Sequence, residues 1–251
     1  MNEFYVGYLP KAHLGIASRI WWTVSVLFLV AATGAIIFAK VQRTYSPSVF
    51  EFGQERTFEG IVDTRPYTAL LVPRPGSPVG QEPYSRYTLV AAGKHGALDQ
   101  VSAFAGKTVR LRGTLIYRDD QTMVELVRGS VFVLADQNHA PETTQNFGTF
   151  TLSGEIVDSK CNFGVMNPGN GKVHRDCAVR CLSGGIPPAF VTNNFNGRRA
   201  TLLLTAPDRQ PLPKEAFLNR VAQPVSIRGN VTQLGETLLL EVRPDTITPL
   251  P

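Results

Sequence analysis

A repeated pattern of short strands is the feature that most restricts how this chain can fold. Residues 109–127, VRLRGTLIYRDDQTMVELV, align without a gap with residues 225–243, VSIRGNVTQLGETLLLEVR, at a spacing of 116 positions. Alternating apolar residues and turns with glycine or aspartate predict about five short strands per copy, and a mid-strand glycine is common where a barrel strand bends. The repeat therefore predicts a mainly β protein with two small OB-like barrels or, as the alternative, two small β-sandwiches.

The second copy of the repeat is longer than the first. Residues 61–63 and 156–158 both read Ile-Val-Asp and lie 95 positions apart, whereas the later match lies 116 positions apart, so the second copy has gained 21 residues. We expect this insertion at about 161–195. Residues 97–105 and 213–221 occupy equivalent places, and each is expected to form the short helix that closes one end of an OB barrel.

Residues 20–39, IWWTVSVLFLVAATGAIIFA, form an uncharged apolar stretch of twenty residues. This length matches the hydrocarbon core of a bilayer and exceeds the roughly 7 to 15 residues of a signal-peptide core. We therefore expect an uncleaved transmembrane anchor rather than a cleaved signal peptide. Two basic residues precede the stretch and two follow it, so the positive-inside rule does not set its orientation. The short N-terminal tail favours a single-pass protein of the bacterial inner membrane with its C-terminal domains in the periplasm.

The anchor and the repeat together divide the chain into six parts. The segment after the anchor is short and contains Pro47, and residues 136–145 are polar, as is typical of connecting segments. The expected parts are an N-terminal tail (1–19), a transmembrane helix (20–39), a stalk (40–54), a first OB-like domain (55–135), a linker (136–148) and a second OB-like domain (149–251).

All three cysteines fall within residues 154–188, inside the longer second copy. Residues 173–183 lack proline and glycine and are followed by Gly184-Gly185 and then by two prolines. A glycine pair followed by proline is a common end to a helix. The sequence therefore predicts a short helix at 173–183.

The predicted helix carries an imidazole and two of the three thiols. His174, Cys177 and Cys181 stand at helical spacings that place them on one face, and Cys161 ends a predicted strand. Sulfur and imidazole nitrogen suit zinc or cuprous copper in a tetrahedral site. We therefore expect a metal site at Cys161, His174, Cys177 and Cys181, with zinc or copper as the cofactor.

Two other states of the cysteines stay open. An extracytoplasmic location favours a disulfide with one free thiol, and buried thiols without a function are the third outcome. The spacing is not that of a covalently attached haem, and three cysteines fall short of the four of an ordinary iron–sulfur cluster.

Several functional classes are not supported by the sequence. There is no nucleophile elbow, no zinc-protease helix motif, no phosphate-binding glycine loop and no dinucleotide fingerprint, and we assign no catalytic residue. The net charge of +5 comes without a run of basic residues, so a nucleic-acid partner is not expected.

Several polar and aromatic residues have structural interpretations. Arg112 and Glu125 recur in the second copy and are expected to form a cross-strand ion pair in each barrel. The turn at 93–96, Gly-Lys-His-Gly, could hold an anion but is more often solvated. Tyr67, Tyr84 and Tyr87 could form an aromatic binding surface, although strand aromatics more often pack against their neighbours.

Three segments resemble those of a family of uncharacterised bacterial membrane-anchored proteins with the same anchor-plus-repeat layout. They read FEGIVDTRPYTALLV, KTVRLRGTLIYRDDQTMVEL and HRDCAVRCLSGGIPP. The resemblance implies the domain layout and no established activity. The Cys-x3-Cys pair with a nearby His is also similar to the thiol pair of Sco-type copper-delivery proteins, although Cys181 is not followed by proline. This resemblance implies Met166 as a candidate thioether ligand.

These observations lead to two functional hypotheses. The first is a membrane-anchored accessory protein whose second domain binds a metal or carries thiol redox chemistry for a membrane or periplasmic protein partner. The second is a binding or assembly module of two OB-like domains, in which the cysteines form a structural disulfide. Bound metal separates the two hypotheses.

Overall fold

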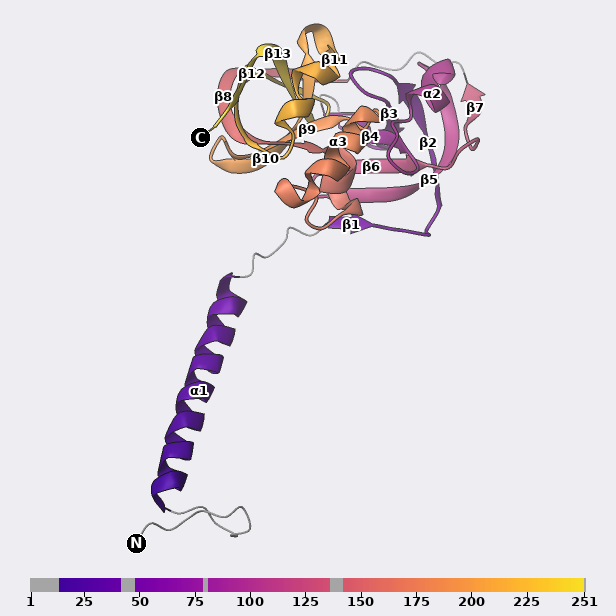
Figure 1. Cartoon of the computed structure of the whole chain (residues 1–251). Coiled ribbons are helices and arrows are strands. Elements are labelled where there is room, and N and C mark those ends of the chain that lie inside the picture. The colour runs from indigo at the N-terminus through magenta and orange to yellow at the C-terminus, as the bar shows by residue number, and fades with distance from the viewer. Residues whose placement is uncertain (1–13, 42–47, 79–80, 136–141, 251) are drawn as a thin grey trace. The chain divides into compact units, whose positions relative to one another are not determined.

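The computed structural model describes residues 14–41, 48–78, 81–135 and 142–250. One helix, α1 (Leu14–Val41), belongs to a unit of its own, Met1–Tyr45, and Ser46–Pro251 forms a second compact unit (Figure 1). The expected linker and stalk therefore lie partly outside the described residues, at 136–141 and 42–47.

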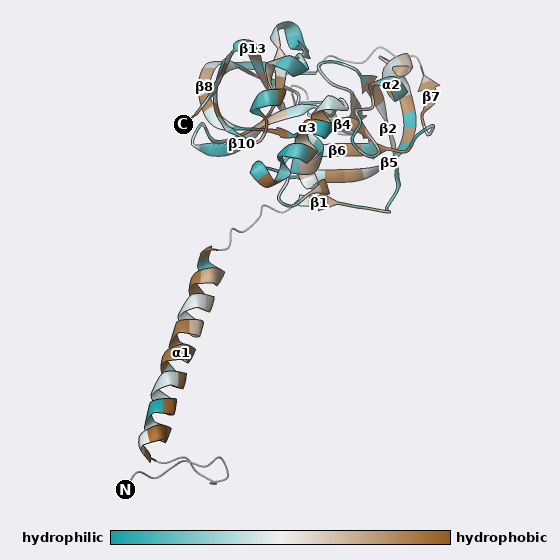
Figure 2. Ribbon diagram, viewed as in Figure 1, coloured by the Kyte–Doolittle hydropathy of each residue, from teal (hydrophilic) through white to brown (hydrophobic). Residues whose placement is uncertain are grey.

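The helix α1 is apolar over most of its length, with hydrophilic bands near its ends (Figure 2). It is 28 residues long, its mean hydropathy reaches 2.2 over 18 residues, and none of its residues is buried. A helix of this length and composition can cross a bilayer. The expected span at 20–39 lies within it, and α1 is consistent with a signal anchor or a signal sequence.

The first copy of the repeat forms a five-stranded barrel. The strands pair in the ring order β5-β2-β3-β4-β6 and back to β5, with β4 and β6 parallel and the other pairs antiparallel. A short helix, α2, lies between β4 and β5, and two further strands, β1 and β7, pair with β5. The bounds are β1 Ser48–Phe50, β2 Arg56–Asp63, β3 Ala69–Pro73, β4 Tyr84–Ala91, α2 Leu98–Val101, β5 Thr108–Arg118, β6 Gln121–Leu126 and β7 Phe132–Ala135.

The second copy repeats this arrangement strand for strand. Its strands pair in the order β12-β8-β9-β10-β13 and back to β12, and the equivalent pair, β10 and β13, is again parallel. A two-residue strand, β11, pairs with β10. The bounds are β8 Thr144–Asp158, β9 Pro188–Phe195, β10 Arg198–Ala206, β11 Gln210–Pro211, β12 Pro224–Leu234 and β13 Thr237–Pro249.

Matched glycines allow the strands of each ring to approach closely. A Cβ atom at Gly113 would lie 2.7 Å from the carbonyl oxygen of Glu125, and one at Gly229 would lie 2.5 Å from that of Glu241. Both distances are too short for a side chain, because Cβ atoms do not approach other atoms within 3.0 Å. The mid-strand glycines of the repeat therefore mark tight points of the two barrels.

Three boundaries and one helix differ from the sequence-based layout. Residues 48–50, expected in the stalk, form β1. Residues 188–195, expected in the insertion, form β9 of the second barrel, and β8 begins at Thr144, inside the expected linker. The helix expected at 97–105 is present as α2 and a following 3₁₀ turn. In place of a helix at 213–221 there are two 3₁₀ turns, because Phe217 between them has a non-helical φ of −136° and buries its ring in the second barrel.

Each barrel has its own apolar core, and a separate cluster joins the insertion to the first barrel. The barrel side chains of this cluster are Val90, Ile116 and Met123, and the insertion contributes Cys161, Phe163, Cys181 and Ile186. The insertion leaves the second barrel after β8 and packs on the first. The cysteines therefore lie where the two copies meet.

Candidate metal centre

The segment between β8 and β9 carries every ligand predicted from the sequence. It contains the turns η2 (Cys161–Val165) and η3 (Lys172–His174) and the helix α3 (Arg175–Ser183). The predicted helix at 173–183 is therefore confirmed, with its first residues in η3.

The helix α3 has two buried faces. Ala178 and Leu182, four residues apart, belong to the core of the second barrel. Cys177 and Cys181, also four residues apart, belong to the cluster on the first barrel. Residues four apart share one face of a helix, so α3 lies between the two copies and turns its thiols toward the first.

The glycine pair predicted to end the helix caps the C-terminus of α3. Gly185 has a φ of 95° and donates its N–H to the carbonyl of Leu182, and Ile186 donates its N–H to the carbonyl of Cys181, both at 3.1 Å. This pair of bonds is the Schellman motif, which usually brings the residue after the glycine into apolar contact with the last helical turn. Ile186 and Cys181 accordingly share one buried cluster.

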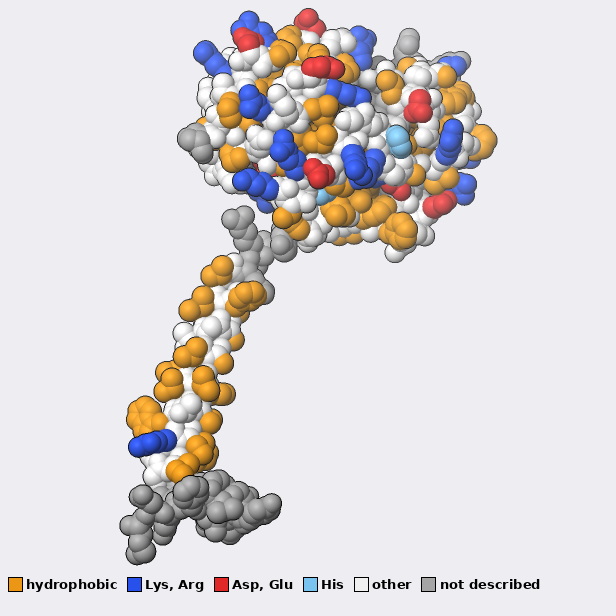
Figure 3. Space-filling view, in the orientation of Figure 1, with side chains coloured by type: hydrophobic (Ala, Val, Ile, Leu, Met, Phe, Trp, Pro, Cys, Tyr) orange, Lys and Arg blue, Asp and Glu red, His pale blue; other side chains and the backbone are white. Residues whose placement is uncertain are grey.

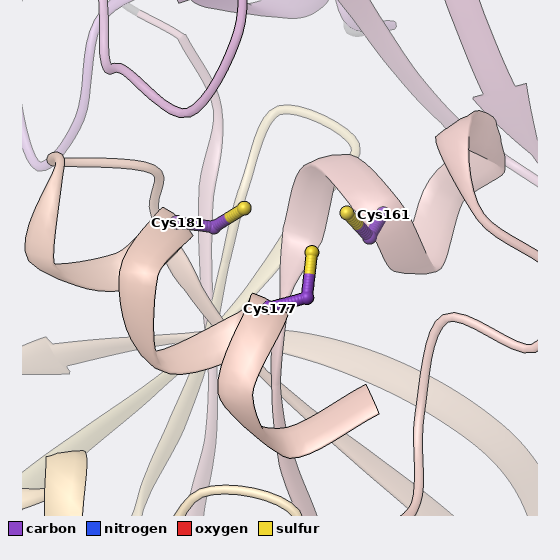
Figure 4. A group of neighbouring side chains, drawn as sticks. All are labelled: Cys161, Cys177 and Cys181. Carbon is purple, nitrogen blue, oxygen red and sulfur yellow. The ribbon is translucent and has the colours of Figure 1, made fainter. Parts of the chain in front are cut away.

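The three thiols point toward one another from α3 and η2 (Figure 4). The sulfur atoms of Cys161, Cys177 and Cys181 all lie within 4.8 Å of one another, and no disulfide joins them. Cys161 and Cys181 are buried, and Cys177 is half-buried. In a tetrahedral zinc site with bonds of about 2.3 Å, sulfurs lie about 3.8 Å apart, so these thiols need to move little to hold a metal ion.

Cys161 is positioned by Asp158, the last residue of β8. The Cys161 N–H donates to Asp158 Oδ1 at 2.8 Å, and the Cys161 carbonyl accepts a bond from Met166 N–H at 3.2 Å. Asp158 is fully buried. The Met166 side chain is 44% exposed, so this candidate thioether lies at the surface.

His174 contacts a carboxylate rather than completing the group of three sulfurs. Its Nε2 lies 2.9 Å from Asp158 Oδ2, and both side chains are buried. Asp158, Cys161 and His174 form a second group whose ligand atoms lie within 4.8 Å of one another. The four predicted ligands therefore fall into two groups that share Cys161.

A lysine of the first barrel faces the thiols. Lys94, in the loop after β4, donates from Nζ to Cys177 Sγ at 2.7 Å and lies 3.8 Å from Cys181 Sγ. The bond to Cys177 and the charges of the cysteines raise the pKa of Lys94. Gly184 allows this approach, because a Cβ there would lie 1.8 Å from the Lys94 carbonyl oxygen. The loop expected to be a solvated turn thus contacts two sulfur atoms of the cluster.

The thiols differ in acidity. Cys161 donates a hydrogen bond to Cys181, and this bond together with burial raises the pKa of Cys161. Acceptance of the same bond, with help from Lys94, lowers the pKa of Cys181 to about 7 although burial and Asp158 oppose the change. The cluster therefore holds a negative sulfur near neutral pH, which is the form that binds metals and reacts.

A buried ion pair joins the base of the cluster to the first barrel. Lys160 pairs with Glu125 and donates to the carbonyls of Ala91 at 2.8 Å and Gly93 at 2.7 Å. The expected pairing of Arg112 with Glu125 is wrong, since Arg112 pairs with Glu55. The buried ammonium requires a counter-charge, and Glu125 supplies it.

Two of the three tyrosines expected at an aromatic surface pack against neighbouring groups instead. Tyr67 donates its hydroxyl to the carbonyl of Leu204 at 2.6 Å and so joins the two barrels, and burial raises its pKa. Tyr87 packs edge-to-face against Phe58 at 6.2 Å. The packing interpretation of these two residues is therefore confirmed.

A hollow of about 450 Å³ also lies between the barrels, beside the end of α3. Its lining includes no cysteine and no histidine, and it is rich in proline and apolar side chains, among them Pro66, Pro187, Pro188, Pro211 and Phe217. The reactive groups of the described residues thus gather at the thiols and not in this hollow.

Four further residues complete the site, and the sequence analysis did not assign them to it. They are Lys94, Asp158, Lys160 and Glu125. Asp158 and Glu125 recur in both copies, which favoured a structural role for them. The sequence signal for Lys94 was its place between Gly93 and Gly96, because glycines permit a close backbone approach.

Comparisons of the chain with protein-family models, curated proteins and solved structures found no match. What the site can do is therefore argued from its own geometry.

Proposed function

We propose that this is a membrane-anchored accessory protein whose thiol cluster binds a soft metal ion, zinc or cuprous copper, through Cys161, Cys177 and Cys181. The observation that carries the proposal is the approach of three free sulfurs to within 4.8 Å of one another beside Lys94. Thiolates are soft donors that select these metals over magnesium or calcium. A cation beside three thiolates offsets the negative charge that a bound metal leaves uncompensated.

The number of available ligands favours cuprous copper in the group of three sulfurs. Zinc takes four ligands in structural sites, and His174 could be the fourth only by leaving Asp158. Cuprous copper accepts three sulfur ligands. Zinc bound by three thiolates and a water is the runner-up, since an open fourth position is typical of zinc sites that do chemistry.

The proposal includes where the protein works. The helix α1 acts as an uncleaved anchor in the bacterial inner membrane, with the two domains in the periplasm and a membrane redox or assembly protein as the partner. Each barrel is of the OB type, because the order of strands and the parallel pair recur in both rings. The resemblance to uncharacterised membrane-anchored proteins fits the same layout. On the face seen in Figure 3, basic and acidic side chains are interspersed, which does not favour a nucleic-acid partner.

Thiol–disulfide chemistry is the second candidate, and the acidity of Cys181 favours it. A thiolate attacks a partner's disulfide, the partner's second sulfur leaves as a thiolate, and a neighbouring cysteine then closes a disulfide within this chain while the partner is fully reduced. Cys161 and Cys181 are only 4% and 2% exposed, however, which restricts the access of a partner's disulfide. The metal proposal is therefore preferred.

Elemental analysis of the full chain tests the proposal. The protein is purified in detergent without chelator or affinity metal, and metal and free thiols are counted on one sample. We expect stoichiometric zinc or copper with protected thiols, and loss of that ion in Cys177→Ser and Cys181→Ser. Met166→Leu is the matched control, because it removes an exposed sulfur near the cluster and should leave the metal in place. A wild-type chain that binds neither metal, with a disulfide and one free thiol, would instead support the binding-module hypothesis.

A further inference from the structure

The second group of ligands, Asp158, Cys161 and His174, is not explained by a single ion among the three sulfurs. We infer that the centre is binuclear, with a zinc ion held by these three residues and the Cys161 thiolate bridging it to the ion of the three-sulfur group. The inference rests on the proposed function for the first ion. It adds a second metal position.

The geometry of the second group suits zinc. His174 Nε2 and Asp158 Oδ2 lie 2.9 Å apart, close to the roughly 3.3 Å between two donors at tetrahedral bonds of about 2.0–2.1 Å. The Cys161 sulfur lies within 4.8 Å of both atoms. Imidazole, carboxylate and thiolate are the three ligand types that zinc takes in proteins.

The charges of the group also favour a cation. Asp158 is 0% exposed, and its one ion-pair partner among the described residues is His174. A buried carboxylate is costly unless it is paired or coordinates a metal. A divalent ion between the carboxylate and the imidazole offsets the charge of Asp158 more fully than a shared proton.

Two neighbouring side chains have polar atoms that lack partners. Within the described residues, both amide atoms of Asn162 and the hydroxyl of Ser159 are buried and form no hydrogen bond, and each residue is 0% exposed. Both lie within two positions of Cys161. Buried polar atoms without partners are rare and often indicate an ion or a water. A bound ion with its water would provide such partners and a fourth ligand.

The backbone holds these ligands in place before an ion arrives. His174 N–H donates to the carbonyl of Gly171 at 2.9 Å, and Gly171 N–H donates to Glu155 on β8 at 2.5 Å. Gly169 lies against Cys161, where a Cβ would be 2.4 Å from the Cys161 carbonyl oxygen. The segment that carries His174 is thus tied to the strand that carries Asp158, as a preformed metal site requires.

Metal counting on the full chain in detergent tests this inference. Metal-free, reduced protein is titrated with Zn²⁺, and separately with Co²⁺, whose absorption reports sulfur ligation. We expect two ions per chain at saturation. Asp158→Asn and His174→Ala should each bind one ion and keep the cobalt–sulfur absorption of the three-sulfur group. Cys177→Ser should also bind one ion, and Cys161→Ser should weaken both positions. His95→Ala is the matched control, because it removes an exposed imidazole near the cluster and should still bind two.

The outcomes separate this inference from the proposed function. One ion per wild-type chain, lost in both His174→Ala and Cys177→Ser, would mean a single site of three cysteines and one histidine, which overturns the inference and leaves the proposed function intact. A chain that binds neither zinc nor cobalt would overturn the inference, and the proposed function fails as well if elemental analysis also finds no copper. If the buried variants fail to fold by circular dichroism, the wild-type count still decides, since saturation at one ion contradicts a binuclear centre.

Discussion

The two barrels share one strand order but differ in the length of the connection between their first two strands. In the first barrel residues 64–68 join β2 to β3, whereas in the second residues 159–187 join β8 to β9 and carry all the cysteines. This longer connection packs against the first barrel through Val90, Ile116 and Met123. The comparison shows that the candidate metal centre belongs to the pair of barrels, because one copy contributes the thiols and the other covers them.

Two equivalent glutamates show how far the copies have diverged. Glu125 on β6 pairs with the buried Lys160 of the insertion. Its counterpart on β13, Glu241, accepts a hydrogen bond from the Asn230 amide at 3.5 Å, and no ion pair of Glu241 is found within the described residues. The same position therefore supports the centre in one barrel and lies in an ordinary polar contact in the other.

The largest expected effect comes from breaking the buried pair. Glu125→Ala leaves Lys160, which is 2% exposed, without its counter-charge and should lower the free energy of unfolding by about 3 kcal/mol or more. Glu241→Ala, at the equivalent position, should cost about 0.5 kcal/mol or less. Urea denaturation of both variants measures the difference. Equal losses would mean that Glu125 has no special role in receiving the insertion.

A glycine at the contact between the copies should have the next largest effect. Gly184→Ala places a Cβ against the Lys94 carbonyl oxygen and should cost about 1–3 kcal/mol, because neither backbone can yield without moving the loop or the helix. Metal affinity should fall with it, since Lys94 moves away from the thiols. Ser183→Ala is the neighbouring control. A fully stable Gly184→Ala with unchanged metal affinity would show that the close contact is not needed.

The pH dependence of the stability of the metal-free protein tests the pKa shifts of the thiols. The pKa of Cys181 is lowered from 9.0 to about 7, so its contribution to stability is present above pH 9 and is lost as the pH falls through 7. The pKa of Cys161 is raised, so its contribution is present below pH 9 and is lost above it. Stability should therefore peak near pH 9.

Thermal unfolding of the reduced, metal-free chain across pH 6 to 10, compared with Cys181→Ser, measures this dependence. The variant should lose the rise between pH 7 and 9. Retention of the rise in Cys181→Ser would assign it to another group.

The smallest expected effect lies at a further contact between the barrels. Tyr67→Phe removes the hydroxyl bond to the Leu204 carbonyl and should cost about 1 kcal/mol, the usual value for one neutral hydrogen bond plus an unpaired carbonyl. Tyr87→Phe, within the first barrel, is the control and should cost less. A neutral Tyr67→Phe would leave the insertion as the main connection between the copies.

The elements that follow from local pattern were predictable. The apolar helix, the strand repeat and the helix at 173–183 depend on composition and spacing over short windows. The gathering of the three cysteines followed as well, since Cys177 and Cys181 share a helix face and the insertion is short.

The contacts between the copies were not predictable from the same patterns. Lys94 lies 83 positions before its partner Cys177, and Glu125 lies 35 positions before its partner Lys160. No spacing rule connects residues so far apart in the sequence. His174 was predicted to share a helix face with the cysteines. Its imidazole instead contacts Asp158, because this buried carboxylate at the end of β8 lies closer than the sulfurs of α3. The end of the insertion was also misplaced, since the apolar residues of β9 follow the helix stop directly.

The central claim is that thiolates between the two barrels hold a metal ion. X-ray absorption at the edge of the bound metal, on the full chain carrying one equivalent of zinc or cuprous copper, tests it most directly. The account predicts a first shell dominated by sulfur at about 2.3 Å, which is lost in Cys177→Ser. A first shell of oxygen and nitrogen alone would contradict it.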